Sequence, residues 1–415
     1  MVVRWSVPYV RYDEANIEKL PKHILGDLFD KDKDALPLSR YFRGEFVGTG
    51  PFKLVEWVEG SHMEFRRHEL YHLGVPPIHR VFLRFIPDIN TMVANLLAGA
   101  VDVSLPEGIY MEKAIELRRR WQEEGTGHQV NSYITPAVYQ LEIMVDPQYA
   151  RPINALPVAA VRQGLYHAID RPALNQVLHG DLGMVADSFY APNDKYYPMV
   201  KDVIPQYPYD SRRARQLFEQ SGWTMGPDGV YVHPASGPTK GSPWDLPSVG
   251  EERFDVQLML FPGQQHVKMG SVIQANWKDA GVNATLESLT PANQADPSYT
   301  SRRSGLYTSN PGGSAFYTGR LLCTSIPTEA NRWSGSNRGH WCNPVTDDLL
   351  TKITYTIPPA EQQVLHRALL AETMGKAMMY PLYWESVPII MVKGVTGPNM
   401  LGSVTTMDIH KWDKN

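Results

Sequence analysis

Much of what would commit a chain to one class of function is missing from this sequence. No stretch holds the ~18 consecutive apolar residues that a membrane-spanning helix needs. Neither sign of charge dominates, because 40 basic residues are balanced by 44 acidic ones and the net charge is −4. This balance argues against nucleic acid or an anionic membrane as the main partner. Residues 1–5 have neither an apolar core nor a small-residue cleavage site, so we expect no signal peptide in this chain.

The familiar motifs of catalysis are missing as well. The sequence has no Gly-x-Ser-x-Gly, no His-Glu-x-x-His and no glycine-rich loop before Lys-Ser/Thr. Its 13 histidines are scattered, and the pair His68 and His72 falls on an expected strand and loop, which argues against a metal site. The acidic pair Asp347-Asp348 is typical of the first turn of a helix, where carboxylates face the positive end of the dipole. We therefore predict no enzyme activity, no cofactor and no metal.

Cysteine is scarce. The two cysteines, Cys323 and Cys342, lie 19 residues apart, and the residues between them are polar and glycine-rich without an apolar stripe. A disulfide closing this loop would stabilise the fold by roughly 3 kcal/mol through the unfolded state, and it would imply an oxidising compartment. Two buried free thiols are the alternative that the residues alone leave open.

What the sequence does contain is typical of a globular α/β protein. Its 415 residues exceed one compact core, so we expect two lobes. The turn Gly48-Thr49-Gly50-Pro51 leads into an extended run at 52–58, and a second run at 63–67 follows the turn at 59–61, which together predict a β-hairpin. Glu56 interrupts the apolar face of the first run. A strand at 81–86, a helix capped by Asn90 and a strand from Val101 are then predicted in this order. Such an alternation favours an α/β lobe.

The remaining pattern continues this alternation. Residues 224–250 are rich in Pro, Gly and Ser and are predicted to form an exposed insertion. Helices are predicted at 110–122, 157–171, 172–178, 211–220, 269–280 and 361–378, and strands at 128–130, 139–145, 254–260, 282–286, 382–390 and at the start of 305–317.

Several sequence blocks, taken in order, resemble the solute-binding proteins of peptide-type ABC importers, known as solute-binding family 5. Each block is modest alone, but their order across most of the chain is specific. The blocks lie at 48–52, 85–88 with 97–102, 161–171, 214–218 with 222–223, 273–277, and 343–344 with 347. Cys323 and Cys342 also stand where some members have a disulfide, which favours the bonded alternative.

The resemblance implies a two-lobe, periplasmic-binding-protein type II-like α/β fold with mixed sheets. Members usually carry a long segment before the Gly48 block, so the first lobe is expected to be incomplete and the chain to be an amino-terminally shortened member. The implied domains are 1–87 in lobe I, 88–380 as lobe II, and 381–415 returning to lobe I, where 387–392 would pair with the hairpin. The lobes would be linked near 85–88 and 380–386.

The function implied by the resemblance is capture without covalent chemistry. The two lobes would enclose a peptide or a similar extended solute and deliver it to a membrane permease, in the periplasm or at the cell surface. An oligosaccharide-binding member and a truncated, non-binding fragment are the alternatives, and the shortened chain is expected to bind at least roughly tenfold more weakly than an extended one. The ligand-binding residues are predicted to be Tyr307, Asn310, Gly312, Gly313, Ser314, Phe316, Tyr317 and Trp384.

One feature of that loop departs from the peptide-binding relatives. Their loop supplies an acidic residue that pairs with the α-ammonium of the ligand, whereas no Asp or Glu stands between Gly305 and Thr324 here. Ser314 occupies about the expected position. An ammonium buried without a counter-charge is costly, so the sequence favours blocked peptides or oligosaccharides over peptides with a free amino terminus. Each aromatic residue of the loop has core packing as its alternative role.

Overall fold

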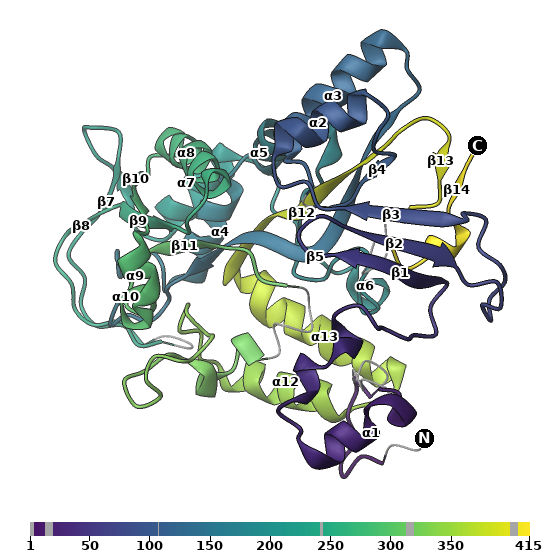
Figure 1. Ribbon diagram of the computed structural model, residues 1–415. Coiled ribbons are helices and arrows are strands. Elements are labelled where there is room, and N and C mark those ends of the chain that lie inside the picture. Colours follow the sequence, from purple (N-terminus) through teal and green to yellow (C-terminus); the bar gives the residue numbers. More distant parts are fainter. Residues whose placement is uncertain (1–3, 13–19, 107, 241–243, 313–318, 399–405) are drawn as a thin grey trace. The chain divides into compact units, whose positions relative to one another are not determined.

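The computed structural model describes residues 4–12, 20–106, 108–240, 244–312, 319–398 and 406–415 (Figure 1). They form two compact units: unit 1 holds the described parts of Met1–Asp13 and Thr135–Glu385, and unit 2 those of Glu14–Ile134 and Ser386–Asn415. The strands β5 (Gln129–Ile143) and β12 (Met379–Met391) run from one unit into the other. From the sequence, the links between the lobes are expected near 85–88 and 380–386, and this assignment of ligand-enclosing lobes stays a prediction.

A mixed sheet forms the framework of unit 1, which confirms the α/β class. Strand β9 (Asp255–Leu260) pairs in parallel with β10 (Asn283–Ser288), and α8 (Gln264–Asp279) connects them. Strand β11 (Leu306–Ser309) is parallel to β9 and antiparallel to β5. The full order is β10-β9-β11-β5-β12-β4 (Figure 1). A parallel pair requires a crossover, and α8, which begins five residues before the predicted start, provides it.

Close packing of helices explains several residues of the 161–171 block. Gly164 lies where α4 (Ala159–His167) meets α7 (Ser211–Gln220), and a Cβ there would stand 2.5 Å from the Phe218 ring, so only glycine permits this approach. Trp277 of α8 donates its indole N–H to the Leu165 carbonyl at 3.0 Å. The other α-helices with described bounds in unit 1 are α5 (Arg171–His179), α6 (Tyr197–Val200), α9 (Pro291–Ala295), α10 (Pro297–Ser301), α12 (Pro344–Tyr355) and α13 (Pro359–Thr373).

The predicted insertion at 224–250 contains more order than its composition suggested. It begins with β6 (Thr224–Met225) and β7 (Tyr231–His233), which pair with β8 (Glu252–Arg253) in a small antiparallel sheet. Isolated bridges join Ser236 to Val249 and Thr239 to Leu246, so the described part of the segment continues as a narrow ribbon. Proline limits regular strands without preventing such pairing.

Unit 2 contains the predicted hairpin. Strands β1 (Phe52–Val58) and β2 (His62–Arg67) pair antiparallel, and β3 (Arg80–Arg84) completes a three-stranded sheet. The register shifts between Leu54 and Glu56, and this bulge explains why Glu56 breaks the alternation. Unit 2 also contains α1 (Lys22–Lys31), α2 (Ile89–Leu97), β4 (Val103–Ser104), α3 (Met111–Glu124), β13 (Val395–Thr396) and β14 (Asp413–Lys414).

Two local expectations for unit 2 are wrong. Strand β12 pairs with β4, with Ile390 opposite Ser104, and the hairpin sheet contains β1, β2 and β3 only among the described strands. The return segment therefore does not extend the hairpin, because its apolar side chains join Tyr133 in a separate core cluster. Helix α2 is capped by Asp88, which accepts from the Thr91 N–H at 2.7 Å, and not by Asn90.

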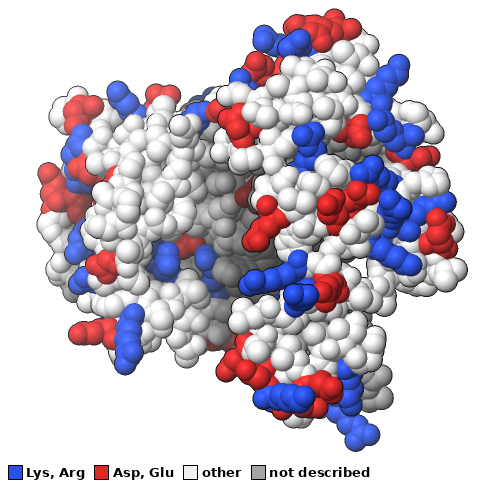
Figure 2. All heavy atoms as spheres, in the orientation of Figure 1, with Lys and Arg blue, Asp and Glu red and all other residues white. Residues whose placement is uncertain are grey.

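The surface agrees with the mild net charge. Acidic and basic side chains are interspersed on the face drawn in Figure 2, and apolar or neutral side chains cover most of it. None of the described helices combines the length and the apolar character needed to cross a bilayer.

Candidate functional site

The predicted ligand loop begins on a buried strand of unit 1. Tyr307 lies on β11 and is 3% exposed, and Asn310 follows the strand at the surface. The backbone N–H of Val138 donates to the Pro311 carbonyl at 3.1 Å, which fixes the start of the loop against β5. Gly312 is described. The other predicted loop residues, Gly313, Ser314, Phe316 and Tyr317, lie outside the described residues.

Trp384, the predicted aromatic at the second crossing, is buried in β12. It is 2% exposed, and its backbone N–H donates to the Met184 carbonyl at 2.9 Å. The structure thus brings Tyr307 and Trp384 into the same mixed sheet. Whether either residue contacts a solute stays a prediction.

An arginine cluster that the sequence reasoning missed lies beside Tyr307. We define it as Arg303, Arg320 and Arg338 around Glu142, the residue opposite Tyr307 on β5. Arg320 Nη1 donates to Glu142 Oε1 at 2.8 Å, and Arg303 Nη2 lies 3.8 Å from Glu142 Oε2. Three of these four groups, Arg320, Arg338 and Glu142, line a cavity of about 30 Å³ together with Gln140. The cluster holds three positive charges against one negative charge.

Burial decides the electrostatics of this cluster. The Arg303 side chain is fully buried, and burial lowers the pKa of its guanidinium to about 10, with Glu142 acting in the opposite direction. Its Nη1 donates to the Thr300 carbonyl at 3.1 Å, whereas Nε and Nη2 have no hydrogen-bond partner among the described residues. The guanidinium also stands over the Tyr307 ring at 5.2 Å, and burial raises the pKa of Tyr307. The site therefore retains excess positive charge in a region of low dielectric.

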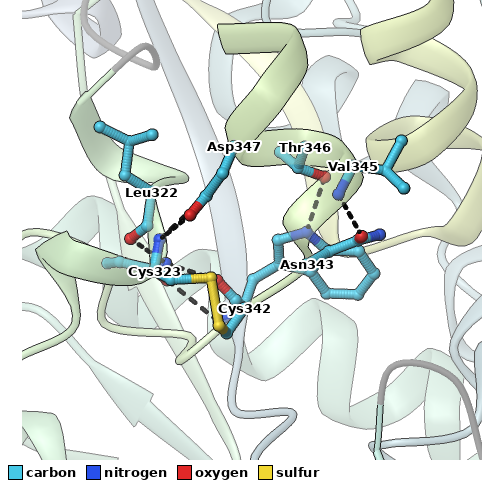
Figure 3. The surroundings of a disulfide bond; sticks show 9 residues. Leu322, Cys323, Cys342, Asn343, Val345, Thr346 and Asp347 are labelled. Carbon is cyan, nitrogen blue, oxygen red and sulfur yellow. Dashed lines mark hydrogen bonds between the residues drawn. A yellow bond between two sulfur atoms is a disulfide. The ribbon is translucent and has the colours of Figure 1, made fainter. Parts of the chain in front are cut away.

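The disulfide fixes the segment that closes one side of the cavity. Cys323 and Cys342 are bonded, as predicted, and residues 336–339 and Trp341 of the enclosed loop line the cavity. Figure 3 shows Asp347 directed at the backbone N–H of Cys323, which donates to Oδ1 at 3.0 Å. Asn343 caps α12 by accepting from the Val345 N–H at 2.9 Å. Asp347 thus lies in the first helical turn, as expected, and also anchors the disulfide.

Within the described ranges, no three His, Cys, Asp or Glu side chains come together in a group that could hold a metal ion. The ionic groups near the ligand loop are instead suited to binding organic ions by hydrogen bonds and charge.

Comparison with known proteins identifies the family. The family model described as bacterial extracellular solute-binding proteins, family 5 Middle, matches residues 8–326, which is more than half of the chain. The chain belongs to this family. Among curated relatives, the oligopeptide-binding protein AppA of Bacillus subtilis is 32% identical over 223 residues, covering 51% of this chain and 36% of AppA. The nickel-binding periplasmic protein of Escherichia coli is 23% identical over 350 residues, covering 83% of this chain and 60% of that protein.

The glutathione-binding protein GsiB of E. coli is 24% identical over 361 residues, covering 85% of this chain and 61% of GsiB. This family 5 chain therefore spans less than two thirds of the length of these curated relatives.

Solved structures of the family share the fold. AppA of B. subtilis in complex with a nonapeptide aligns with a TM-score of 0.60 at 18% identity, covering 99% of this chain and 75% of that one. NikZ of Campylobacter jejuni in complex with Ni(L-His) aligns with a TM-score of 0.64 at 20% identity, covering 98% and 75%. At these identities the likeness establishes the fold of family 5 solute-binding proteins.

The cluster had a weak signal in the sequence of this family 5 protein. Glu142 interrupts an apolar strand, and a charged residue in a central strand requires a buried partner. Arg303 stands just before the ligand loop and could have been proposed as that partner. The pairing with Arg320 joins residues that are 178 positions apart in the chain, and the residue pattern does not specify such a contact.

Proposed function

We propose that this chain is the solute-binding component of an ABC importer and captures a peptide-like solute that carries a carboxylate. It would deliver this solute to a membrane permease from an extracytoplasmic compartment, and it would carry out no covalent chemistry. Membership of the extracellular solute-binding family supports the class. The Cys323–Cys342 disulfide fits the oxidising compartment.

The carboxylate is the chemical group shared by the solutes named for several relatives. They include a nonapeptide and a pentapeptide, glutathione, and the nickel complex of L-histidine. Peptides, glutathione and histidine differ in size and shape, but each presents at least one carboxylate. A solute of this class requires a cationic partner in the protein.

The arginine cluster supports the assignment and is the observation that carries it. Glu142 pairs with Arg320 at 2.8 Å and lies 3.8 Å from the fully buried Arg303, so the three arginines of the cluster leave two positive charges in excess. Arg320 and Arg338 line the cavity. Both are partly exposed. A guanidinium presents paired N–H donors that match the two oxygens of a carboxylate, and such charge-assisted bonds are strong where water is partly excluded.

Calorimetry with a panel of peptides of two to five residues, each also in its carboxy-amidated form, tests the proposal. We expect the peptides with a free carboxylate to bind. Arg338→Met should lower their affinity at least tenfold, or about 1.4 kcal/mol. Amidated peptides should bind poorly and respond little to the substitution. Arg338 has no hydrogen bond to the fold among the described contacts, so its replacement leaves folding intact, and Arg320→Met is a second variant. The exposed helical Arg213→Met is the matched control.

Neutral maltose-type oligosaccharides complete the panel. Binding of an oligosaccharide without any peptide would overturn the carboxylate assignment in favour of the saccharide alternative. Failure of every solute to bind would favour the non-binding alternative, and turnover of a bound peptide would contradict the absence of enzyme activity.

A further inference from the structure

Glu385 has an unusual set of partners. It lies on β12 at the edge of unit 1, and its Oε2 accepts from Thr135 Oγ1 at 2.7 Å. Its Oε1 accepts from Asn310 Nδ2 at 2.9 Å. Both donors are neutral, and Asn310 belongs to the predicted ligand loop. The carboxylate is therefore held in a fixed position on three segments of the chain without being neutralised.

Neutral donors leave the charge of Glu385 uncompensated. In the part of the chain that the structure describes, no Lys, Arg or His forms an ion pair with Glu385, whereas Glu142 has two arginines beside it. The carboxylate is only partly buried and Asn310 is exposed, so the site is accessible to a solute. A positioned, half-buried anion without a cation attracts one from solution.

Aromatic rings form the adjoining surface. Tyr139 lies four residues after Thr135 on β5, so both residues share one face of the strand. The Tyr139 ring stacks on the Tyr383 ring, with 4.9 Å between the ring centroids. Burial, and next the charge of Glu385, raise the pKa of Tyr139 to about 12, so the phenol is neutral at pH 7. His266 lies 5.3 Å from the Tyr139 ring, and burial lowers its pKa to about 4, so it carries no charge either.

The chemistry of this set selects among cations. A divalent metal such as Ca²⁺ takes six to eight oxygen ligands, and one carboxylate with an amide and a hydroxyl is a poor match. An organic ammonium needs one anion, a few acceptors and an aromatic face within about 6 Å. Glu385 supplies the anion, the side-chain amide oxygen of Asn310 supplies an acceptor, and Tyr139 supplies the aromatic face.

We propose that Glu385, positioned by Asn310 and Thr135 beside Tyr139, binds the ammonium group of the solute. This inference rests on the proposed function, and it narrows the solute to one with both a carboxylate and an ammonium. It also provides the counter-charge that the sequence of the ligand loop lacks, and it reverses the expectation of an amine-blocked peptide.

The experiment uses the peptides of the same panel with a free amino terminus and the same peptides N-acetylated. Titration calorimetry compares the wild-type chain with Glu385→Gln, which keeps the shape and an acceptor oxygen but removes the charge. We expect the substitution to lower the affinity for free-amine peptides at least tenfold and to change the affinity for the acetylated peptides by less than twofold. Glu361→Gln, an exposed residue of α13, removes the same charge elsewhere and should change neither.

Every outcome bears on one of the two proposals. If acetylated peptides bind as tightly as free ones to the wild-type chain, or if Glu385→Gln weakens both equally, the ammonium assignment fails while the carboxylate assignment stands. If amidation at the carboxyl end has no effect but acetylation does, the carboxylate assignment fails alone. Binding of acetylated peptides to Glu385→Gln also shows that the variant folds, and failure of all peptides contradicts both proposals.

Discussion

Buried histidines make the stability of unit 1 depend on pH. The Tyr190 hydroxyl lies 2.6 Å from His366 Nδ1, and burial raises the pKa of this phenol well above its usual value, so the hydroxyl donates and Nδ1 accepts. Burial lowers the pKa of His366 to about 4. The same cause lowers the pKa of His179 and of His266 to about 4. In the unfolded chain the pKa of histidine is about 6.5, so below that pH the unfolded chain binds protons that the folded chain does not bind.

The free energy of unfolding should therefore fall as the pH decreases from about 6.5 to about 4, because a histidine with a lowered folded pKa loses its contribution in that window. His366→Asn keeps an acceptor for Tyr190 and removes the titrating group. We expect the difference in unfolding free energy between pH 7 and pH 4.5 to shrink by about 2 kcal/mol in this variant. Urea titrations at both pH values measure it. The control variant His72→Asn, at an exposed position, should leave this difference unchanged. If His366→Asn also leaves it unchanged, His366 is not a source of the pH dependence.

At the scale of elements, the disulfide loop connects stability to the candidate site. The bond joins Cys323 to Cys342 over 19 residues, and the loop places residues 336–339 on the cavity. Replacing both cysteines by serine should lower the free energy of unfolding by about 3 kcal/mol, measured by urea denaturation. The affinity for free-carboxylate peptides should fall as well, since Arg338 is no longer held in place. Reductant should reproduce both effects in the wild type and change nothing in the double variant; unchanged affinity would place the site elsewhere.

The elements of this fold were largely predictable, whereas the long-range contacts were not. Apolar periodicity and the glycine-containing turns predicted the hairpin, and α7 begins and ends where predicted, at Ser211–Gln220. The same periodicity left Arg162 as an ordinary helical arginine. In the structure it is 1% exposed and donates to the carbonyls of Leu156, Lys376 and Ala377. Lys376 and Ala377 lie more than 200 residues from Arg162, and such distant partners leave no local pattern. The arginine cluster and Glu385 were missed because their contacts also join distant parts of the chain.

At the scale of the whole molecule, buried surface is distributed unevenly. No residue of β1 or β3 is buried and only Glu64 of β2 is, whereas nearly every residue of β12 is buried. Local opening requires little free energy where few side chains are buried. We expect backbone amides of the β1–β2–β3 sheet to exchange hydrogen at least tenfold faster than those of β9 and β11, measured by mass spectrometry of peptic fragments. Equal protection in both sheets would show that the chain opens only as a single cooperative unit.

The position of β12 within the sheet has a consequence for biosynthesis. This strand lies between β5 and β4 in the sheet, yet its residues 379–391 follow every other strand of that sheet in the chain. Until the ribosome has passed Met391, the strands already made form two separate fragments with an open edge on each. Open edges pair readily with other chains. The nascent polypeptide therefore cannot complete this sheet before Met391 has been synthesised, and the edge of β5 stays open to other chains until then.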